Sequence, residues 1–159
     1  AVFNPGGPRV EWSVRVHDFP SLVQQAEAAT WPKPHVIMFD AFSPAKNPAM
    51  WTRPLFARLF QLLDPDRPCA LPTYSRSTLL RVTLLLAGFF VGVGHATGEK
   101  EQTTIAANSP ALVREPLDRR WLERARRSTS AEPLETAVYR QAPLSKATWE
   151  QLLQHPQFG

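Results

Sequence analysis

The sequence predicts an α/β fold in which a parallel sheet carries helices on both faces. Apolar segments of strand length alternate with segments of helix length, in the order strand, helix, strand, helix, strand, helix, strand, strand. One of them, Val36–Phe39, is apolar throughout, which is typical of a strand buried on both faces. The chain has 159 residues, 43% of them hydrophobic and 20% charged, as expected for one globular domain.

The first elements precede residue 40. A half-buried strand is expected at 10–16, where apolar and polar residues alternate. Pro20 then opens a short helix that ends before Pro32. The apolar strand at 36–39 follows and ends in Asp40.

A stiff polar loop follows Asp40. Prolines at positions 44, 48 and 54 can continue neither a strand nor a helix, so the chain must turn here. A carboxylate at the carboxyl end of a buried strand, followed by such a loop, stands where open α/β sheets place their ligands. Asp40 is therefore a candidate site residue, with an ordinary strand-capping aspartate as the alternative.

The remaining elements of the sheet lie between residues 52 and 107. They are a helix from Thr52 or Arg53 to Leu63, a strand at 69–74, a helix capped by Ser77 and ended by Gly88, and short strands at 89–94 and 103–107. The last two strands would pair as an antiparallel hairpin. Pro72 removes a hydrogen-bond donor from its strand, so we expect a distortion there.

The composition changes at Ser109, which divides the chain into residues 1–108 and a Pro/Arg-rich helical tail at 109–159. The tail begins with a basic amphipathic helix within 116–127 and ends with a short helix opened by Ser145. The candidate RNA contacts of the basic helix are Arg120, Arg124 and Arg127. The alternative is a solvated charged face.

Composition and charge limit the function classes. A net charge of +4 and a pI near 9.7 permit a nucleic-acid partner. The only cysteine, Cys69, excludes an internal disulfide and suits a buried small hydrophobe, and the scattered histidines suggest no metal site. No signal peptide is visible in the given residues, and the most apolar window, 82–94, is too short to span a bilayer. A cytoplasmic location without membrane contact is therefore expected.

Residues 40–52 read Asp-Ala-Phe-Ser-Pro-Ala-Lys-Asn-Pro-Ala-Met-Trp-Thr. They closely resemble the loop after the fourth strand of the MnmC-like methyltransferases, and the resemblance extends more weakly over residues 10–108. These enzymes use S-adenosyl-L-methionine (SAM) to finish 5-methylaminomethyl-uridine at the tRNA wobble position. The resemblance implies a Rossmann-like class I methyltransferase fold, closed by an antiparallel hairpin, with SAM as cofactor and tRNA as partner.

The resemblance also suggests roles for individual residues. Asp40 would orient the substrate amine and help to remove its proton, because an alkylammonium with a pKa near ~10 has no lone pair. The implied cofactor contacts are Asp18, Asp40 and Phe42. The implied substrate contacts are Lys46, Asn47, Trp51, Thr73, Tyr74 and Lys100.

Several of these residues have a local alternative. Asp18 would hold the adenine amino group or cap a helix, and His17 stands where the family usually has glycine. Phe42 and Trp51 would stack on a base or pack the loop onto the core. Lys46 and Asn47 would contact substrate or fix the loop. Lys100 lies between two glutamates, which would repel phosphate.

Two parts of a SAM site are missing from the sequence, namely a glycine-rich turn after a first strand and an acidic residue ending a second. The glycines at 92, 94 and 98 have the wrong spacing and belong to the expected hairpin. On the family pattern the glycine motif would lie upstream of Ala1. We therefore expect the carboxyl-terminal half of a methyltransferase, with an incomplete SAM site and no activity alone. The family's FAD-dependent oxidoreductase domain would lie upstream or act as a separate partner.

Two other functions remain open at this point. The same fold could methylate a different small amine, since the chain departs from the family at His17, Pro72 and Glu99. The half-fold could also serve as a non-catalytic interaction module. A Gly-x-Gly turn in the upstream reading frame, followed by a strand ending in an acidic residue, would favour the enzyme.

Overall fold

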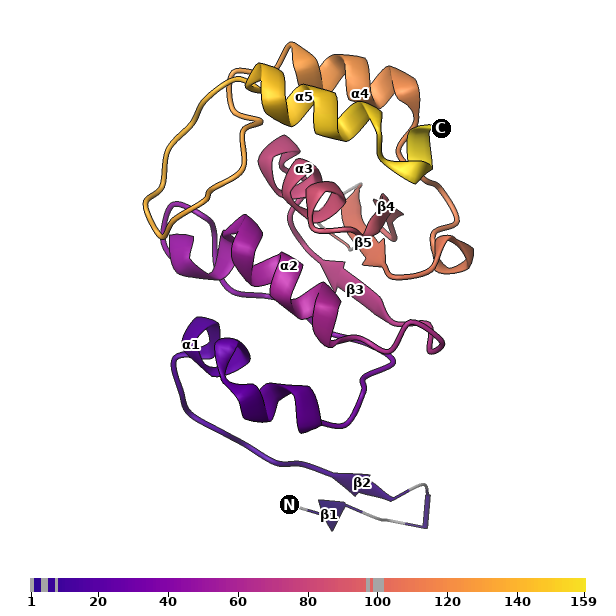
Figure 1. The fold of residues 1–159 in the computed structure, drawn as a ribbon. Coiled ribbons are helices and arrows are strands. Elements are labelled where there is room, and N and C mark those ends of the chain that lie inside the picture. The colour runs from indigo at the N-terminus through magenta and orange to yellow at the C-terminus, as the bar shows by residue number, and fades with distance from the viewer. Residues whose placement is uncertain (1, 4–5, 8, 97, 99–101) are drawn as a thin grey trace.

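A computed structural model describes residues 2–3, 6–7, 9–96, 98 and 102–159, and the structural statements below concern these residues. Figure 1 shows an α/β fold. The helices are α1 (Phe19–Gln24), α2 (Arg53–Leu62), α3 (Thr78–Leu86), α4 (Arg119–Arg126) and α5 (Lys146–Leu153). The strands are β1 (Val2–Phe3), β2 (Val10–Glu11), β3 (Ala70–Thr73), β4 (Phe90–Gly94) and β5 (Thr103–Ala107). Short 3-10 helices lie at Ala26–Thr30, Pro48–Trp51, Pro110–Leu112 and Pro156–Phe158.

The main sheet has three strands in the order β3-β5-β4, and β5 is antiparallel to both neighbours. Ala106 stands opposite Leu71 on one side and Val91 on the other. The expected hairpin is confirmed as the pair β4 and β5. A parallel ladder is not seen in this sheet among the described residues, because β5 lies between β3 and β4 and pairs antiparallel with both.

Parallel pairing in the described residues lies outside the main ladders, at the segment before Asp40 and at an isolated bridge between Thr52 and Leu134. The amide of Ile37 donates to the carbonyl of Ala70 at 2.8 Å, and the amide of Phe39 donates to the carbonyl of Pro72 at 3.2 Å. Pro72 has no N–H to return to this segment, so only one bridge, between Val36 and Ala70, is formed. The expected burial of 36–39 on both faces is also wrong, since Val36 is 50% and Met38 78% exposed.

The expected strand at 10–16 is largely absent. Only Val10 and Glu11 belong to a strand, and they pair with β1 rather than with the main sheet, from which Figure 1 shows them well separated. Val14 and Val16 are 82% and 90% exposed. Alternating apolar residues form a strand only where a neighbouring strand and a core take up their backbone and side chains, and the main sheet offers neither to this segment.

Helices α2 and α3 follow the expected caps, whereas the helix expected before Pro32 is divided into α1 and a 3-10 helix at Ala26–Thr30. The hydroxyl of Thr52 accepts a hydrogen bond from the amide of Leu55, and that of Ser77 accepts one from Leu80, so α2 and α3 begin where predicted. Gly88, with φ of 106°, ends α3. Helix α3 is buried along most of its length, as expected from its nearly continuous apolar sequence. None of the described helices is long and apolar enough to cross a bilayer.

The carboxyl-terminal segment packs on the same core as α2 and α3. The expected tail helices are confirmed as α4 and α5, capped by Asp118 and Ser145. Trp121 and Leu152 belong to the hydrophobic cluster that also contains residues of α2, α3 and the sheet. The division of the chain into 1–108 and 109–159 stays a prediction.

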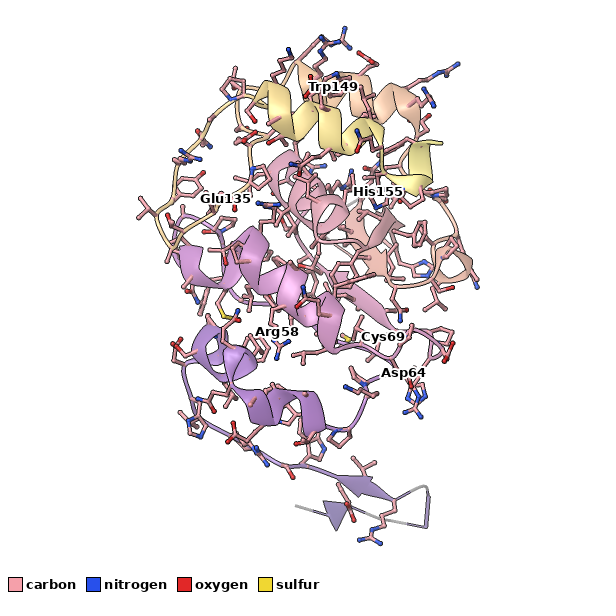
Figure 2. All side chains as sticks on the ribbon, in the orientation of Figure 1. Arg58, Asp64, Cys69, Glu135, Trp149 and His155 are labelled. Carbon is pink, nitrogen blue, oxygen red and sulfur yellow. The ribbon has the colours of Figure 1, made fainter. Side chains whose placement is uncertain are left out.

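Cys69 directly precedes β3, inside the molecule, and Figure 2 labels it together with Asp64. Its side chain is 1% exposed, so the prediction of a buried small hydrophobe is confirmed, and burial raises the pKa of its thiol. Asn108 fixes this corner: its Oδ1 accepts from the amide of Cys69 at 2.7 Å, and its Nδ2 donates to the carbonyls of Asp64 and Arg67.

Candidate functional site

A cleft of about 840 Å³ opens at the carboxyl ends of β3 and β4. Side chains alternate across a strand, so Leu71 and Ala106 enter the core while Pro72 and Ile105 line the cleft. No residue of the described α-helices lines it. The expectation of helices on both faces is thus wrong for the described residues: one face carries the helices, and the other forms the floor of the cleft.

Three of the residues singled out from the sequence meet in this cleft: Asp40, Thr73 and Tyr74. Asp40 is exposed and directly follows Phe39, which is 5% exposed. The Phe39 ring packs edge-to-face on Trp51, with 5.3 Å between ring centroids, and also contacts Phe56. The backbone that presents the Asp40 carboxylate is therefore fixed from below by buried aromatic packing.

The loop after Asp40 contains a strained residue. Phe42 has φ of +60°, the only positive φ of a described residue other than glycine, and its side chain is 76% exposed. The carbonyl of Ser43 then accepts hydrogen bonds from the amides of Lys46 and Asn47. Lys46 is exposed and Asn47 half-buried, and neither they nor Phe42 line the cleft.

Trp51 lies in the core. It is 2% exposed and contacts Phe39 and Phe56, which corresponds to the packing alternative considered for it. The indole Nε1 has no hydrogen-bond partner among the described residues. Because the Trp51 ring is buried against Phe39 and Phe56, neither of its faces is available for stacking on a base in this conformation.

Asp18 lies apart from the cleft. It precedes α1, its carboxylate accepts a hydrogen bond from the hydroxyl of Ser21, and its side chain is exposed. These contacts give Asp18 a local role at the start of the helix. Lys100 lies outside the described residues.

Arg120 and Arg124 lie on the exposed side of α4 and Arg127 directly follows the helix, and all three line a second, shallow depression. Trp121 and Leu122 are buried and face the core, so the helix turns its arginines outward. Asp118 and Glu123 also line this depression and place negative charge among the arginines.

Sequence reasoning missed Arg81. This residue of α3 is 5% exposed, donating from Nε to Oγ1 of Thr104 and from Nη2 to the carbonyl of Thr103, both at 3.0 Å. Burial, together with the positive charges of Arg124 and Arg76, lowers its pKa. The sequence feature that could have identified Arg81 is its position as the one charged residue of a largely apolar helix.

The cleft suits a medium-sized organic ligand. Its volume lies within the usual range of roughly 300–1,000 Å³ for ligand sites. Met38 and Ile105 supply apolar walls, whereas Asp40 and Thr73 supply a carboxylate and a hydroxyl. An exposed carboxylate complements a cationic ligand, such as a sulfonium or an ammonium. Among the described residues, no three His, Cys, Asp or Glu side chains gather as metal ligands would.

Comparisons of the sequence and of the structure with known proteins agree on one protein family. The family described as S-adenosyl-L-methionine-dependent methyltransferase matches residues 4–109. The tRNA 5-methylaminomethyl-2-thiouridine biosynthesis bifunctional protein MnmC of Methylibium petroleiphilum is 35% identical over 82 residues, 52% of this chain and 12% of that protein. The protein of the same name from Ralstonia nicotianae is 32% identical over 106 residues, 67% of this chain and 15% of that protein.

A solved structure is similar over most of the chain. The crystal structure of MnmC2 from Aquifex aeolicus aligns with a TM-score of 0.62 and 26% sequence identity. The alignment covers 87% of this chain and 42% of that one. The chain thus corresponds to less than half of the solved relative, and to a still smaller share of the bifunctional proteins.

Proposed function

The chain belongs to the S-adenosyl-L-methionine-dependent methyltransferase family, and we propose that it forms the amine-binding part of a Rossmann-like class I N-methyltransferase acting on tRNA. The observation that carries this proposal is the presence of Asp40, Thr73 and Tyr74 in one cleft at the strand ends. The names of the relatives, which are tRNA 5-methylaminomethyl-2-thiouridine biosynthesis proteins, suggest the aminomethyl group of a wobble uridine as the substrate.

The proposed chemistry needs a free amine. When bound, SAM supplies an electrophilic methyl group. A protonated alkylammonium has no lone pair to offer to that group, so a base must first remove one proton. Asp40 and Glu115 are both exposed carboxylates of the cleft, and we assign Asp40, at the end of the paired segment 35–39, to orient the ammonium and accept its proton. Thr73 and Tyr74, at the end of the neighbouring strand, would bind the rest of the nucleotide.

The cofactor would lie against the same cleft. Its contacts within this chain would be Asp40 and the strained loop at Phe42, whereas the glycine-rich turn would come from residues upstream of Ala1. The expected roles of Asp18, Lys46, Asn47 and Lys100 are retained as proposals, although Asp18, Lys46 and Asn47 do not line the cleft and Lys100 lies outside the described residues. Methylation of another small amine remains the alternative substrate class. An oxidoreductase partner and a cytoplasmic location also remain proposals.

The proposal is tested by methyl transfer from labelled SAM. The acceptors would be a tRNA carrying 5-aminomethyl-2-thiouridine at the wobble position and the same tRNA with unmodified uridine. We expect the intact protein to label the first and leave the second unlabelled. Labelling of a free alkylamine at a comparable rate would favour the alternative substrate, and failure to label any of these acceptors would contradict the proposal.

A further inference from the structure

The loop at 40–51, which begins with Asp40, is fixed at both of its ends. Before its start, the amide of Phe39 donates to the carbonyl of Pro72 at 3.2 Å. At its end, Trp51 lies in the core, and its ring packs on that of Phe39 with 5.3 Å between centroids. Because close-packed side chains move together, a displacement of Trp51 would also displace Phe39 and the adjacent Asp40.

A second loop, residues 131–145, contacts the chain directly after the 40–51 loop. Figure 1 shows this connection between α4 and α5 extending to the start of α2. The carbonyl of Leu134 accepts a hydrogen bond from the amide of Arg53 at 2.8 Å, and Leu134 also forms an isolated parallel bridge with Thr52. Leu134 is 1% exposed, so this contact is part of the protein interior.

The side chains of Arg53 and Glu135 add a two-point ion pair to this contact. Nε of Arg53 donates to Oε1 of Glu135 at 2.7 Å, and Nη2 donates to Oε2 at 3.1 Å. This hydrogen bonding raises the pKa of Arg53. Arg53 is the first residue of α2, where the helix dipole disfavours a positive charge, so α2 by itself does not account for an arginine here. Figure 2 shows Glu135 beside the start of α2.

The 131–145 loop is itself fixed to α5. The carboxylate of Glu132 accepts hydrogen bonds from the amide of Ser145 and from the hydroxyl of Thr148, both at 2.8 Å. The amide of Glu132 donates to the carbonyl of Ala142 at 3.0 Å, which closes the loop at its base. Helix α5 belongs to the same hydrophobic cluster as α2, so the base of the loop cannot move independently of the core.

We propose that Glu135 is a positioning residue for Asp40: through its ion pair with Arg53, it keeps the 40–51 loop in the conformation in which Asp40 lines the cleft. This inference rests on the proposed function. Among the described residues, no hydrogen bond or ion pair holds the Asp40 side chain, so its position depends on the backbone of the loop. A misplacement of about 1 Å can slow a reaction by roughly 100-fold, so a contact remote from the substrate can control the rate.

The experiment compares three variants of the intact protein. Glu135→Arg places a positive charge against Arg53, and Arg53→Glu/Glu135→Arg restores an ion pair with its polarity reversed. Glu150→Arg is the matched control, because it makes the same change in the exposed pair Lys146–Glu150 of α5 and adds the same charge to the protein.

The first measurement does not require methyl transfer. Amide hydrogen exchange, followed by mass spectrometry in a peptide that covers residues 40–52, reports how often the loop opens. We expect exchange in this peptide to be at least about threefold faster in Glu135→Arg than in wild type. Arg53→Glu/Glu135→Arg and Glu150→Arg should exchange at the wild-type rate.

The second measurement separates kcat from KM for methyl transfer to tRNA. We expect kcat of Glu135→Arg to fall by about tenfold or more, with KM for tRNA within about twofold of wild type, because the change displaces the base rather than an RNA contact. Kcat of Arg53→Glu/Glu135→Arg should return to within about threefold of wild type. An exposed pair contributes little to stability, so the melting temperature of Glu135→Arg should fall by less than about 4 °C.

The two proposals fail in different ways. Equal exchange and equal kcat in Glu135→Arg and Glu150→Arg would overturn the positioning role and leave the proposed function intact. Faster exchange with an unchanged kcat would also overturn it, and so would a double variant as slow as Glu135→Arg. Absence of methyl transfer in wild type would remove the proposed function, and the exchange rates of the three variants would then still decide whether Glu135 fixes the 40–51 loop.

Discussion

The side-chain amide of Gln157 pairs with both backbone groups of Val91. Its Oε1 accepts from the Val91 amide at 2.7 Å, and its Nε2 donates to the Val91 carbonyl at 2.8 Å and to that of Leu117 at 2.9 Å. Residues 115–117 also run along this edge, with the amide of Leu117 donating to the carbonyl of Val91. The end of the chain thereby covers part of the β4 edge that would otherwise be unpaired.

Gln157→Ala should lower the free energy of unfolding by about 1–3 kcal/mol, because the Val91 amide would be left without a partner in a buried setting. Gln154→Ala, at an exposed side chain after α5, is the control and should change stability by less than about 0.5 kcal/mol. Urea unfolding of both variants measures the difference. Equal stability of the two would show that water replaces the amide without cost.

His155 should make stability depend on pH. Its Nδ1 accepts from the amide of Gln157, its Nε2 is buried without a partner among the described residues, and burial lowers its pKa. Figure 2 shows it where α5 leads into the final turn. The unfolded chain therefore binds a proton more readily, so stability should fall as the pH drops below about 6.5.

His155→Asn tests this dependence. Asn keeps an acceptor for the amide of Gln157 at the start of the last 3-10 helix but removes the titrating group. The loss of unfolding free energy between pH 7.5 and 5.5 should be smaller in this variant than in wild type. Identical losses would assign the pH dependence to other groups.

The positive φ of Phe42 should lower the free energy of unfolding by a measurable amount. A residue with a Cβ is strained in this region, whereas glycine is not. Phe42→Gly and Phe42→Ala both remove the exposed ring, but only Phe42→Gly also removes the strain. We expect the glycine variant to be more stable than the alanine variant by about 1 kcal/mol in urea unfolding. The opposite order would mean that φ at this position relaxes without cost.

Asp40→Asn tests the proposed base in the intact protein. The substitution keeps the size and one acceptor oxygen but removes the charge. We expect methyl transfer to slow by roughly 10²–10⁴-fold, with little change in stability or SAM affinity, and with partial recovery at higher pH, where more amine is already deprotonated. A rate within about threefold of wild type at every pH would remove Asp40 from the chemistry. A loss of SAM affinity would assign it to the cofactor instead.

The helices and their caps could be predicted from the sequence because their signals are local. Thr52, Ser77 and Ser145 hydrogen bond to residues three positions later, and Gly88 ends α3 through its own φ. The β4–β5 hairpin could also be predicted from the sequence, because its two strands are close together in the chain. The cleft residue Asp40 was identified from the apolar run before it and the prolines after it.

The order and direction of the strands in the sheet could not be predicted from local sequence signals. Periodicity says that a segment has strand character, but it does not say which strand lies beside it or in which direction. Val14 and Val16 alternate as strand residues do, yet they are exposed because the main sheet does not pair with them. Only the tertiary structure shows β5 between β3 and β4, and with it the open face that forms the cleft.

The sequence by itself determined the family, through the loop at 40–52, and the positions of the helices, because these depend on side chains close together in the chain. The tertiary structure alone decided which candidate residues share a site. Trp51 and Asp40 lie in the same motif, but packing on Phe39 and Phe56 places Trp51 in the core. Arg81 stands out in the sequence only as one charged residue in an apolar helix, and folding alone brings it to Thr103 and Thr104, because long-range contacts depend on how helices and strands pack.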